Sequence, residues 1–180
     1  MHIVSLFSGA GGLDLGLVRA GHKIIWANDI FTDAVSTYCQ NIGNHVDTRD
    51  ICEITDSEIP DCDADVGGFP CQGFSVANWG RSTKDPRNQL YRQFVRIVHA
   101  KKPKYFVAEN VKGLASMGKG EVLCRIVKDF ENSGYKVQHQ VVNAADYGTP
   151  QVRMRILIVG VRKDITSSLQ FPPHPTHANP

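Results

Sequence analysis

The sequence has no Cys-x-x-Cys pair, no internal repeat and no apolar run near the roughly 18 residues that a membrane span needs. Its five cysteines are an odd number, which argues against a disulfide framework or a zinc ribbon and suits a reducing cytoplasm. No thiol or carboxylate stands near His174 and His177, so we predict no metal site. The N-terminal run Met1–Phe7 lacks a basic leader and a small-residue cleavage site, which indicates a buried strand rather than a signal peptide. We therefore expect a cytoplasmic protein without a membrane partner.

The charge balance is near neutral, but its distribution is uneven. The formal net charge is +2. The segment 47–65 holds eight acidic residues and one basic residue, whereas 81–104 holds eight basic residues and one acidic residue. Such runs are usually solvated faces. The alternative is a basic side that meets nucleic-acid phosphates, and charge alone leaves both readings open.

Short apolar runs alternate with helical patterns along most of the chain. The expected strands are His2–Phe7, Lys23–Asn28, Asp65–Gly67 and Tyr105–Glu109, and the expected helices are Gly12–Ala20, Thr32–Asn41, Leu90–Lys101 and Glu121–Ser133. This alternation predicts an α/β fold with a doubly wound, mostly parallel sheet that is covered on both faces.

The last part of the chain has a different pattern. Lys136–Asn143 and Arg155–Val161 are β-rich with no long helix between them, so we expect an antiparallel pair at one edge of the sheet. The segment Phe171–Pro180 has four prolines in ten residues, which is typical of a linker. We therefore predict one domain over residues 1–165, followed by a linker over 166–180.

Glycines and acids at the predicted strand ends indicate a ligand site. The first strand runs into Phe7–Asp14, a glycine-rich loop through which a backbone can approach a ligand closely. Asp29 follows the second strand, where ribose hydroxyls would lie, and Asp50 is placed to hold an adenine amino group. The third glycine of the dinucleotide fingerprint is missing, so the pattern favours an adenosine ligand without a pyrophosphate. Each acid alone is more often a helix cap or a surface group.

The segment Gly67–Ser75 reads Gly-Gly-Phe-Pro-Cys-Gln-Gly-Phe-Ser and follows a buried strand. We therefore expect Cys71 to lie at the carboxyl edge of the sheet, in a loop that glycine and proline shape. A nucleophilic cysteine needs this exposure and a positioned backbone. The other four cysteines are interpreted as small hydrophobic residues.

These motifs resemble those of the carbon-5 cytosine DNA methyltransferase family. The resemblance rests on the glycine loop, on Phe-Pro-Cys-Gln, and on three further motifs in the family's order: Asp85–Leu90, Glu109–Val111 and Asn143–Arg155. It covers roughly residues 3–177. Many members have Arg where this chain has Val152. The family's target-recognition domain and final motifs have no counterpart here, so the linker would lead toward an absent recognition domain.

The resemblance implies a Rossmann-like, S-adenosyl-L-methionine-dependent methyltransferase that forms a covalent Cys71 adduct with a flipped-out cytosine. Glu109 is expected to face ring nitrogen N3, Arg155 to hold the carbonyl O2, and Arg153 to support the cysteine loop or the substrate. The implied cofactor contacts are Phe7, Ser8, Gly9, Ala10, Gly11, Gly12, Leu13, Asp29, Ile30, Asp50, Ile51, Gly68, Pro70 and Leu90. The implied substrate contacts are Gln72, Ser75, Arg87, Asn110 and Gln151.

The implied partners are double-stranded DNA and either a missing C-terminal recognition part or a complementary subunit. The resemblance suggests a prokaryotic restriction-modification enzyme that associates with the nucleoid through DNA. Two alternatives remain open. One is a tRNA cytosine-5 methyltransferase, because one branch of the family uses the same Pro-Cys and Glu-Asn-Val residues. The other is an inactive adenosine-binding fragment or subunit.

Overall fold

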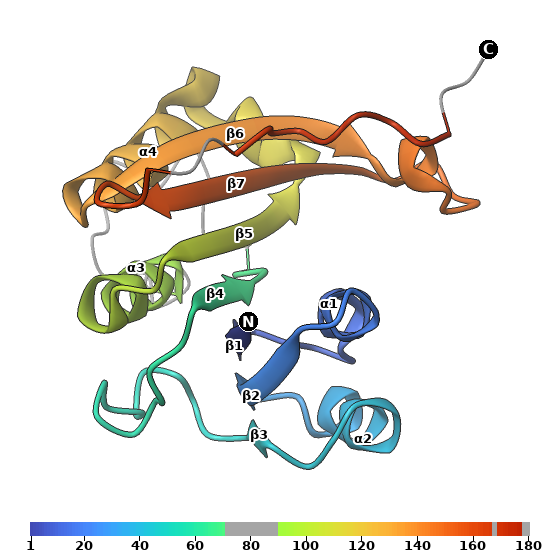
Figure 1. Ribbon diagram of the computed structural model, residues 1–180, viewed down its shortest axis with the longest axis vertical. Helices are drawn as coiled ribbons and strands as arrows, with labels where there is room; N and C mark the ends of the chain where they lie inside the picture. Colours follow the sequence, from blue (N-terminus) through green and yellow to red (C-terminus); the bar gives the residue numbers. More distant parts are fainter. Residues whose placement is uncertain (71–89, 167–168, 178–180) are drawn as a thin grey trace.

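The computed structural model describes residues 1–70, 90–166 and 169–177, and its ribbon is drawn in Figure 1. The sheet has the strand order β3-β2-β1-β4-β5-β7-β6. Its strands are β1 (His2–Leu6), β2 (Lys23–Asn28), β3 (Val46–Asp47), β4 (Ala64–Gly67), β5 (Tyr105–Val111), β6 (Tyr135–Asn143) and β7 (Met154–Arg162). The pairs among β1 to β5 are parallel, whereas β7 is antiparallel to both β5 and β6.

In the part of the chain that the structure describes, four α-helices connect and cover the strands. They are α1 (Gly12–Arg19), α2 (Thr32–Asn41), α3 (Leu90–Lys101) and α4 (Glu121–Asn132), with single turns η2 (Lys112–Ala115), η3 (Met117–Gly120) and η4 (Ala144–Tyr147). Helices α1 and α2 lie on one face of the sheet, and α3 and α4 lie on the other (Figure 1). None of the helices in the described ranges is long and apolar enough to cross a membrane.

Two hydrophobic clusters fill the space between the helices and the sheet. Between the sheet and helices α3 and α4, Phe94 of α3, Phe106 of β5 and Phe130 of α4 are fully buried. The Phe106 and Phe130 rings stack with centroids 4.2 Å apart. On the opposite face, Ile3, Ala27 and Tyr38 form the centre of a smaller cluster. Because successive strand residues point to opposite faces, Ile3 joins one cluster and Val4 the other. The predicted doubly wound α/β fold is confirmed.

The predicted antiparallel pair is also confirmed, with one refinement. Strand β7 does not lie at the edge; it sits between β5 and β6, so β6 is the edge strand. The two-residue strand β3 was not predicted, because two residues carry no periodicity. Arg155 follows Met154 at the start of β7, beside the carboxyl ends of the parallel strands.

Where the structure describes them, the residues after β7 form neither helix nor strand. They are nevertheless attached to the domain. The trace returns along β6 toward η4 (Figure 1), where the backbone N–H groups of Thr176 and His177 donate hydrogen bonds to the Asp146 carbonyl. Proline prevents regular structure by removing N–H donors, but its carbonyl still accepts, as Pro173 does from the Tyr147 hydroxyl.

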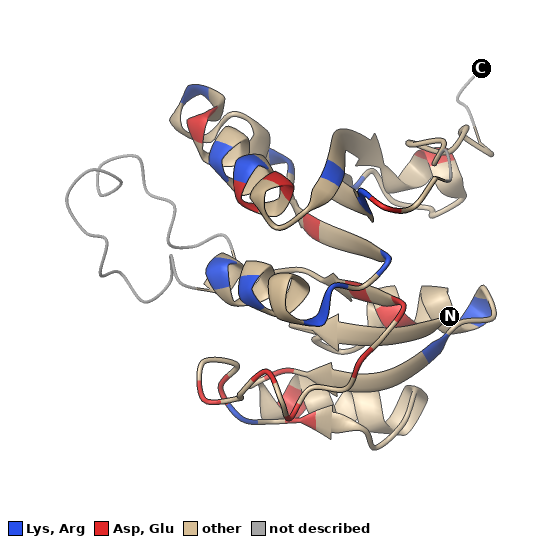
Figure 2. Ribbon diagram, turned by 60° about the vertical axis from the view of Figure 1, so that its left-hand side comes forward, with Lys and Arg blue, Asp and Glu red and all other residues tan. Residues whose placement is uncertain are grey.

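The acidic and basic runs of the sequence pair with each other. Arg96 on α3 forms an ion pair with Asp56, Lys101 pairs with Asp61 at 3.3 Å, and Lys104 pairs with Asp63 at 2.9 Å. Figure 2 shows the Lys and Arg residues of α3 beside the acid-rich segment that precedes β4. For these three cations the structure favours an intramolecular partner over a phosphate-binding face. Arg81, Lys84 and Arg87 lie outside the described residues.

Candidate active site

Three cavities adjoin one another at the carboxyl ends of the parallel strands. The first, of about 460 Å³, is lined by Phe7, Asn28, Asp29, Ile30, Phe31, Asp50, Ile51, Gly68, Pro70 and Leu90. The second, of about 590 Å³, is lined by Ser5, Phe7, Ser8, Gly12, Leu13, Asp14, Gly67, Gly68, Glu109, Ala144, Thr149 and Arg153. The third, of about 480 Å³, is lined by Phe69, Pro70, Glu109, Asn110, Val111, Arg153 and Arg155. The three cavities share lining residues, so they are neighbours, and together they are called the cleft below.

The glycine loop after β1 has a conformation that its sequence requires. Phe7, Gly9 and Gly11 all have positive φ, at 55°, 55° and 85°. A Cβ on Gly11 would lie 2.2 Å from Ile42 Cδ1 and 2.8 Å from Tyr38 Cδ2, so only glycine fits there. Phe7 has no such freedom, and a left-handed residue of this kind marks stored strain of the sort that clusters at ligand sites.

Asp29 connects the loop to the end of β2. Its carboxylate accepts hydrogen bonds from the backbone N–H of Gly9 at 2.7 Å and of Phe31 at 2.9 Å. Asp29, which is predicted to bind the ribose hydroxyls, is therefore also the residue that fixes the glycine loop. Asp50 lines the same cavity and accepts a 2.9 Å bond from the Cys52 N–H through Oδ1. Both acids thus combine a local capping role with a place in the first cavity.

A buried polar network supports the loop from below. The Ser5 hydroxyl donates to Asp14 at 2.7 Å and the Tyr38 hydroxyl donates to the other Asp14 oxygen at 2.8 Å. Burial raises the pKa of the Asp14 carboxyl, against these two hydrogen bonds, which lower it. The network ties β1, α1 and α2 together beneath the second cavity.

Unlike the Ser5 hydroxyl, the Ser8 hydroxyl is buried without a hydrogen-bond partner among the described residues. It lines the second cavity. A buried hydroxyl without a partner costs free energy, which a ligand in this cavity would relieve.

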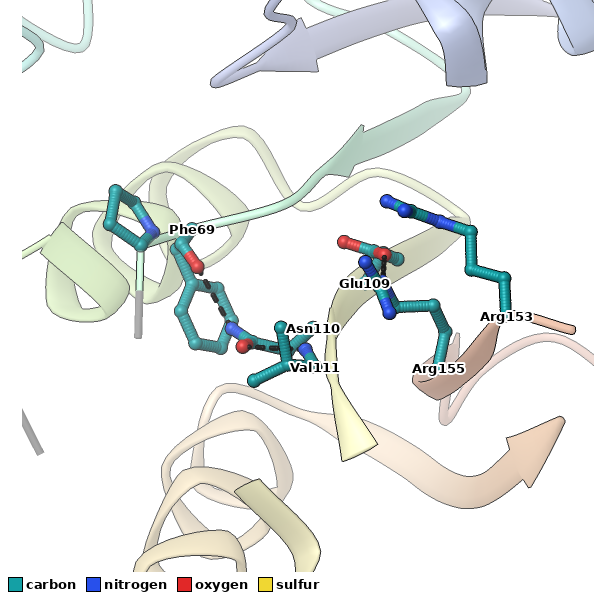
Figure 3. A pocket seen from close by; sticks show the side chains of 7 residues that line it. Phe69, Glu109, Asn110, Val111, Arg153 and Arg155 are labelled. Carbon is teal, nitrogen blue, oxygen red and sulfur yellow. Dashed lines mark hydrogen bonds and ion pairs between the residues drawn. The ribbon is translucent and has the colours of Figure 1, made fainter. Parts of the chain in front are cut away.

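Glu109 and Arg155 form the polar wall of the third cavity. Glu109 Oε1 lies 2.8 Å from Arg155 Nε, and each side chain keeps about a quarter to a third of its surface exposed, at 31% and 25%. Figure 3 shows both side chains at the cavity with Arg153 beside them. A Cβ on Gly68 would lie 3.0 Å from Glu109 Oε2, so the glycine makes room for the carboxylate against the backbone of the cysteine loop.

Asn110 holds the backbone that leads into the cysteine loop. Its amide nitrogen donates a 2.8 Å hydrogen bond to the Phe69 carbonyl, and its amide oxygen accepts from the Val111 N–H at 2.9 Å (Figure 3). The residue is only 4% exposed. Asn110 thus positions the Phe69 backbone, and because it also lines the third cavity, its substrate contact stays a prediction.

The loop between β6 and β7 brings Arg153 to the cleft. Asn143 Oδ1 accepts hydrogen bonds from the N–H groups of Arg153 at 2.9 Å and Ala145 at 3.4 Å, which closes the base of the loop. Arg153 lines both the second and the third cavity. Gln151 is exposed and belongs to the lining of none of the three cavities in the described part of the chain.

Most of the predicted cofactor residues come together here. Those lining the first two cavities are Phe7, Ser8, Gly12, Leu13, Asp29, Ile30, Asp50, Ile51, Gly68, Pro70 and Leu90. Gly9, Ala10 and Gly11 shape the loop without lining these cavities. Cys71, the predicted nucleophile, and the predicted substrate contacts Gln72, Ser75 and Arg87 lie outside the described residues.

The sequence analysis missed several residues of the cleft. Phe31 is 70% exposed at the first cavity, and its place next to Asp29 was an available signal. Asn28 donates to the Asp47 and Arg49 carbonyls at 2.9 Å each, which holds the next strand end in place. Ala144 and Thr149 line the second cavity; both lie within the Asn143–Arg155 motif, but neither was singled out as a site residue.

A doubly wound sheet with a glycine loop, a carboxylate after its second strand and a cleft at the strand ends defines a Rossmann-like domain of the class that binds adenosine-containing cofactors. The Glu109–Arg155 pair lines that cleft, and together with the Pro70-Cys71 sequence after β4 it resembles the motifs of methyltransferases. The chain belongs to the C-5 cytosine-specific DNA methylase family, whose profile matches residues 1–179.

Individual relatives agree with this assignment. The Type II methyltransferase M.NgoFVII of Neisseria gonorrhoeae is 50% identical over 177 residues, which are 97% of this chain and 47% of the relative. M.BspRI of Lysinibacillus sphaericus is 42% identical over 99% of this chain and 48% of its own length. An E. coli crystal structure described as a prophage-encoded DNA modification methyltransferase superposes with a TM-score of 0.79 at 30% identity, covering 94% of this chain and 49% of that one. The chain thus spans about half the length of these relatives.

Proposed function

We propose that this chain is the catalytic and cofactor-binding half, over residues 1–165, of a DNA (cytosine-5-)-methyltransferase of restriction-modification type. The observation that carries the proposal is the Glu109–Arg155 pair, held 2.8 Å apart next to the Phe69-Pro70 backbone that leads into Cys71. A carboxylate and a guanidinium side by side match the N3 and O2 edge of a cytosine ring, where one group must be protonated and the other is a carbonyl acceptor.

The first two cavities fit S-adenosyl-L-methionine. Asp29 and Asp50 supply acceptors, Ile30 and Phe31 supply exposed apolar surface, and the unpartnered Ser8 hydroxyl supplies a donor in the adjoining second cavity. When bound, the cofactor supplies an electrophilic methyl group from its sulfonium. The residues of this chain orient it: the glycine loop approaches it through the backbone, and Asp29 fixes that loop.

The chemistry that the family resemblance assigns to the other residues follows from the needs of cytosine. Carbon 5 is a poor nucleophile until a thiolate adds at carbon 6, and Cys71 is the proposed thiolate. Glu109 stabilises the protonated N3 that accepts the displaced electron pair, and Arg155 binds O2. Carbon 5 would then bond to the methyl group that the bound cofactor supplies, while the bond from that methyl group to sulfur breaks and its electrons stay on sulfur. A base would remove the carbon-5 proton, and the electrons of that C–H bond would restore the carbon 5–carbon 6 double bond and expel the Cys71 thiolate. A base inside a duplex is out of reach, so it must be flipped into the third cavity at a cost of a few kcal/mol.

We infer the partners of this chain from its relatives, because the chain spans only about half of their length. Double-stranded DNA is the proposed substrate, because several relatives are named Type II methyltransferases. The recognition of a base sequence and the remaining wall of the cofactor site are assigned to the half that these 180 residues do not span. We therefore expect the chain alone to methylate DNA poorly and to need that half, as a continuing chain or as a subunit.

The test is adduct trapping with an oligonucleotide that carries 5-fluorocytosine at the target site, using the chain joined to its missing half. Fluorine cannot leave as the proton does, so the covalent complex accumulates. The parent and a Cys124→Ser control, which changes an exposed cysteine on α4, should form the adduct, and Cys71→Ser should not. An adduct in Cys71→Ser would refute the assignment. Comparing methyl transfer to duplex DNA and to tRNA separates the DNA enzyme from the tRNA alternative.

A further inference from the structure

The loop between β6 and β7 carries cleft residues at both of its ends. Ala144 and Thr149 line the second cavity, and Arg153 lines the second and third. Asn143 fixes only the base of this loop, through its bonds to Arg153 and Ala145. The outer part, from Asp146 to Gly148, is held by a segment much later in the chain.

That segment is Phe171–His177, and its contacts are specific. The Asp146 carbonyl accepts the N–H groups of Thr176 at 3.0 Å and His177 at 2.9 Å. The Tyr147 hydroxyl donates to the Pro173 carbonyl at 3.0 Å across 26 positions of sequence. These bonds join the two segments around β7, so they are tertiary contacts and not a local turn.

The His177 ring lies where a side chain at position 148 would be. Gly148 ends η4 in a left-handed conformation with φ of 90°. A Cβ there would lie 2.8 Å from His177 Cε1 and 3.0 Å from Nδ1, and the Thr176 hydroxyl lies 3.0 Å from the same Nδ1. The histidine ring therefore occupies the space that the absent side chain leaves, and its orientation is fixed by its neighbour.

We propose that Phe171–His177 is a strap that holds the β6–β7 loop against the cleft, and that Tyr147 and Gly148 are positioning residues for Arg153. Movement of the outer loop is transmitted to Arg153 because Ala144 N–H also donates to the Arg153 carbonyl, at 3.0 Å. This proposal rests on the proposed function in one respect: it assumes that Arg153 contacts a substrate or a cofactor in the cleft. The strap itself is a property of this fold.

The test compares two glycine substitutions that carry the same backbone strain. Gly148→Ala places a methyl group against His177. Gly134→Ala is the control, because Gly134 follows α4 with φ of 101° and has nothing within 4 Å of its missing Cβ. Hydrogen exchange is followed at the Thr176, His177 and Arg153 amides of the chain. In Gly148→Ala we expect the exchange rates of these amides to rise by about tenfold or more, because local opening of the strap would expose them to solvent. In Gly134→Ala the rates should stay unchanged. Equal effects of the two substitutions would overturn the strap.

Two further variants keep the test decisive. Adding His177→Ala to Gly148→Ala makes room for the new methyl group, so Arg153 protection should return toward the parent value. Tyr147→Phe removes one hydroxyl and should loosen the strap without a steric clash. In the enzyme joined to its missing half, Gly148→Ala should lower kcat for methyl transfer, while the melting temperature stays near that of Gly134→Ala. If even the parent transfers no methyl group, the proposed function fails, and the exchange data still decide the strap.

Discussion

The Glu109 carboxylate and the Arg155 guanidinium meet diagonally across two antiparallel strands. Glu109 is opposite Leu157 in the β5–β7 register, and Arg155 is opposite Val111, so the two charged residues are diagonal neighbours on one face of the sheet. Long side chains can span that diagonal, and Nε lies 2.8 Å from Oε1. The register of β7 therefore determines the polar wall of the cleft.

Replacement of Glu109 by glutamine should remove methyl transfer while leaving the fold intact. The amide cannot hold the proton that N3 needs, and loss of such a group lowers rates by roughly 100-fold to 10,000-fold. Labelled-methyl transfer by the completed enzyme measures the effect, with exposed Glu131→Gln on α4 as the matched control. Retention of full activity in Glu109→Gln would assign the proton to another group.

A methyl group at position 68 should displace the Glu109 carboxylate at Oε2, the oxygen that does not contact Arg155 Nε. The Gly68 Cβ would lie 3.0 Å from Glu109 Oε2, so in Gly68→Ala the carboxylate must shift. We expect kcat to fall by about tenfold or more, since misplacement by an ångström or less is costly in a preorganised site. Gly16→Ala, whose Cβ would meet nothing within 4 Å, serves as the control and should be active. Equal activity of the two variants would mean that Glu109 need not occupy its present place.

The charge of Asp29 should matter for cofactor affinity through the glycine loop. Asp29→Asn keeps one acceptor but turns an NH₂ group toward an N–H donor, either Gly9 or Phe31. Bonds to a charged acceptor contribute about 1.5–3 kcal/mol, so affinity for S-adenosyl-L-homocysteine should fall about tenfold or more. Calorimetric titration measures this against Asp33→Asn, an exposed acid in the first turn of α2. Unchanged affinity in Asp29→Asn would remove Asp29 from the site.

Asp65 should make the stability of the domain depend on pH. It is fully buried in β4, and burial raises its pKa to about 7, against a bond from the Cys62 thiol and the charge of Lys101. The folded protein then keeps a proton that the unfolded chain loses near pH 4, so the free energy of unfolding falls as pH rises from about 4 to about 7. The slope from this one group is at most about 1.4 kcal/mol per pH unit.

The variant Asp65→Asn should lack that part of the slope. The free energy of unfolding is measured with urea at several pH values. Between pH 4 and pH 7 it should fall less steeply in Asp65→Asn than in the parent, and above pH 7 the difference between the two proteins should be constant. Asp61→Asn is the control, because its carboxylate is 92% exposed, and its curve should run parallel to that of the parent. A parallel curve for Asp65→Asn would show that Asp65 is ionised in the folded protein.

The sequence by itself determined the parts of this protein that local patterns encode. Alternating apolar runs and helical faces gave the strand and helix boundaries to within about two residues, because burial on one face imposes a period. The glycines after the first strand predicted a tight turn, and Gly9 and Gly11 both have positive φ there. Asp29 and Asp50 could be placed at the cleft because parallel strands end at one edge of the sheet.

Only the tertiary structure decided which side chains meet. The partnership of Glu109 with Arg155 depends on strand register, and that of Asn110 with Phe69 on the packing of β4 against β5. The pairing of the acidic and basic runs, and the return of Phe171–His177 to the β6–β7 loop, join segments tens of residues apart. Local periodicity carries no information on such partners, because they are set by how the whole sheet and its helices pack.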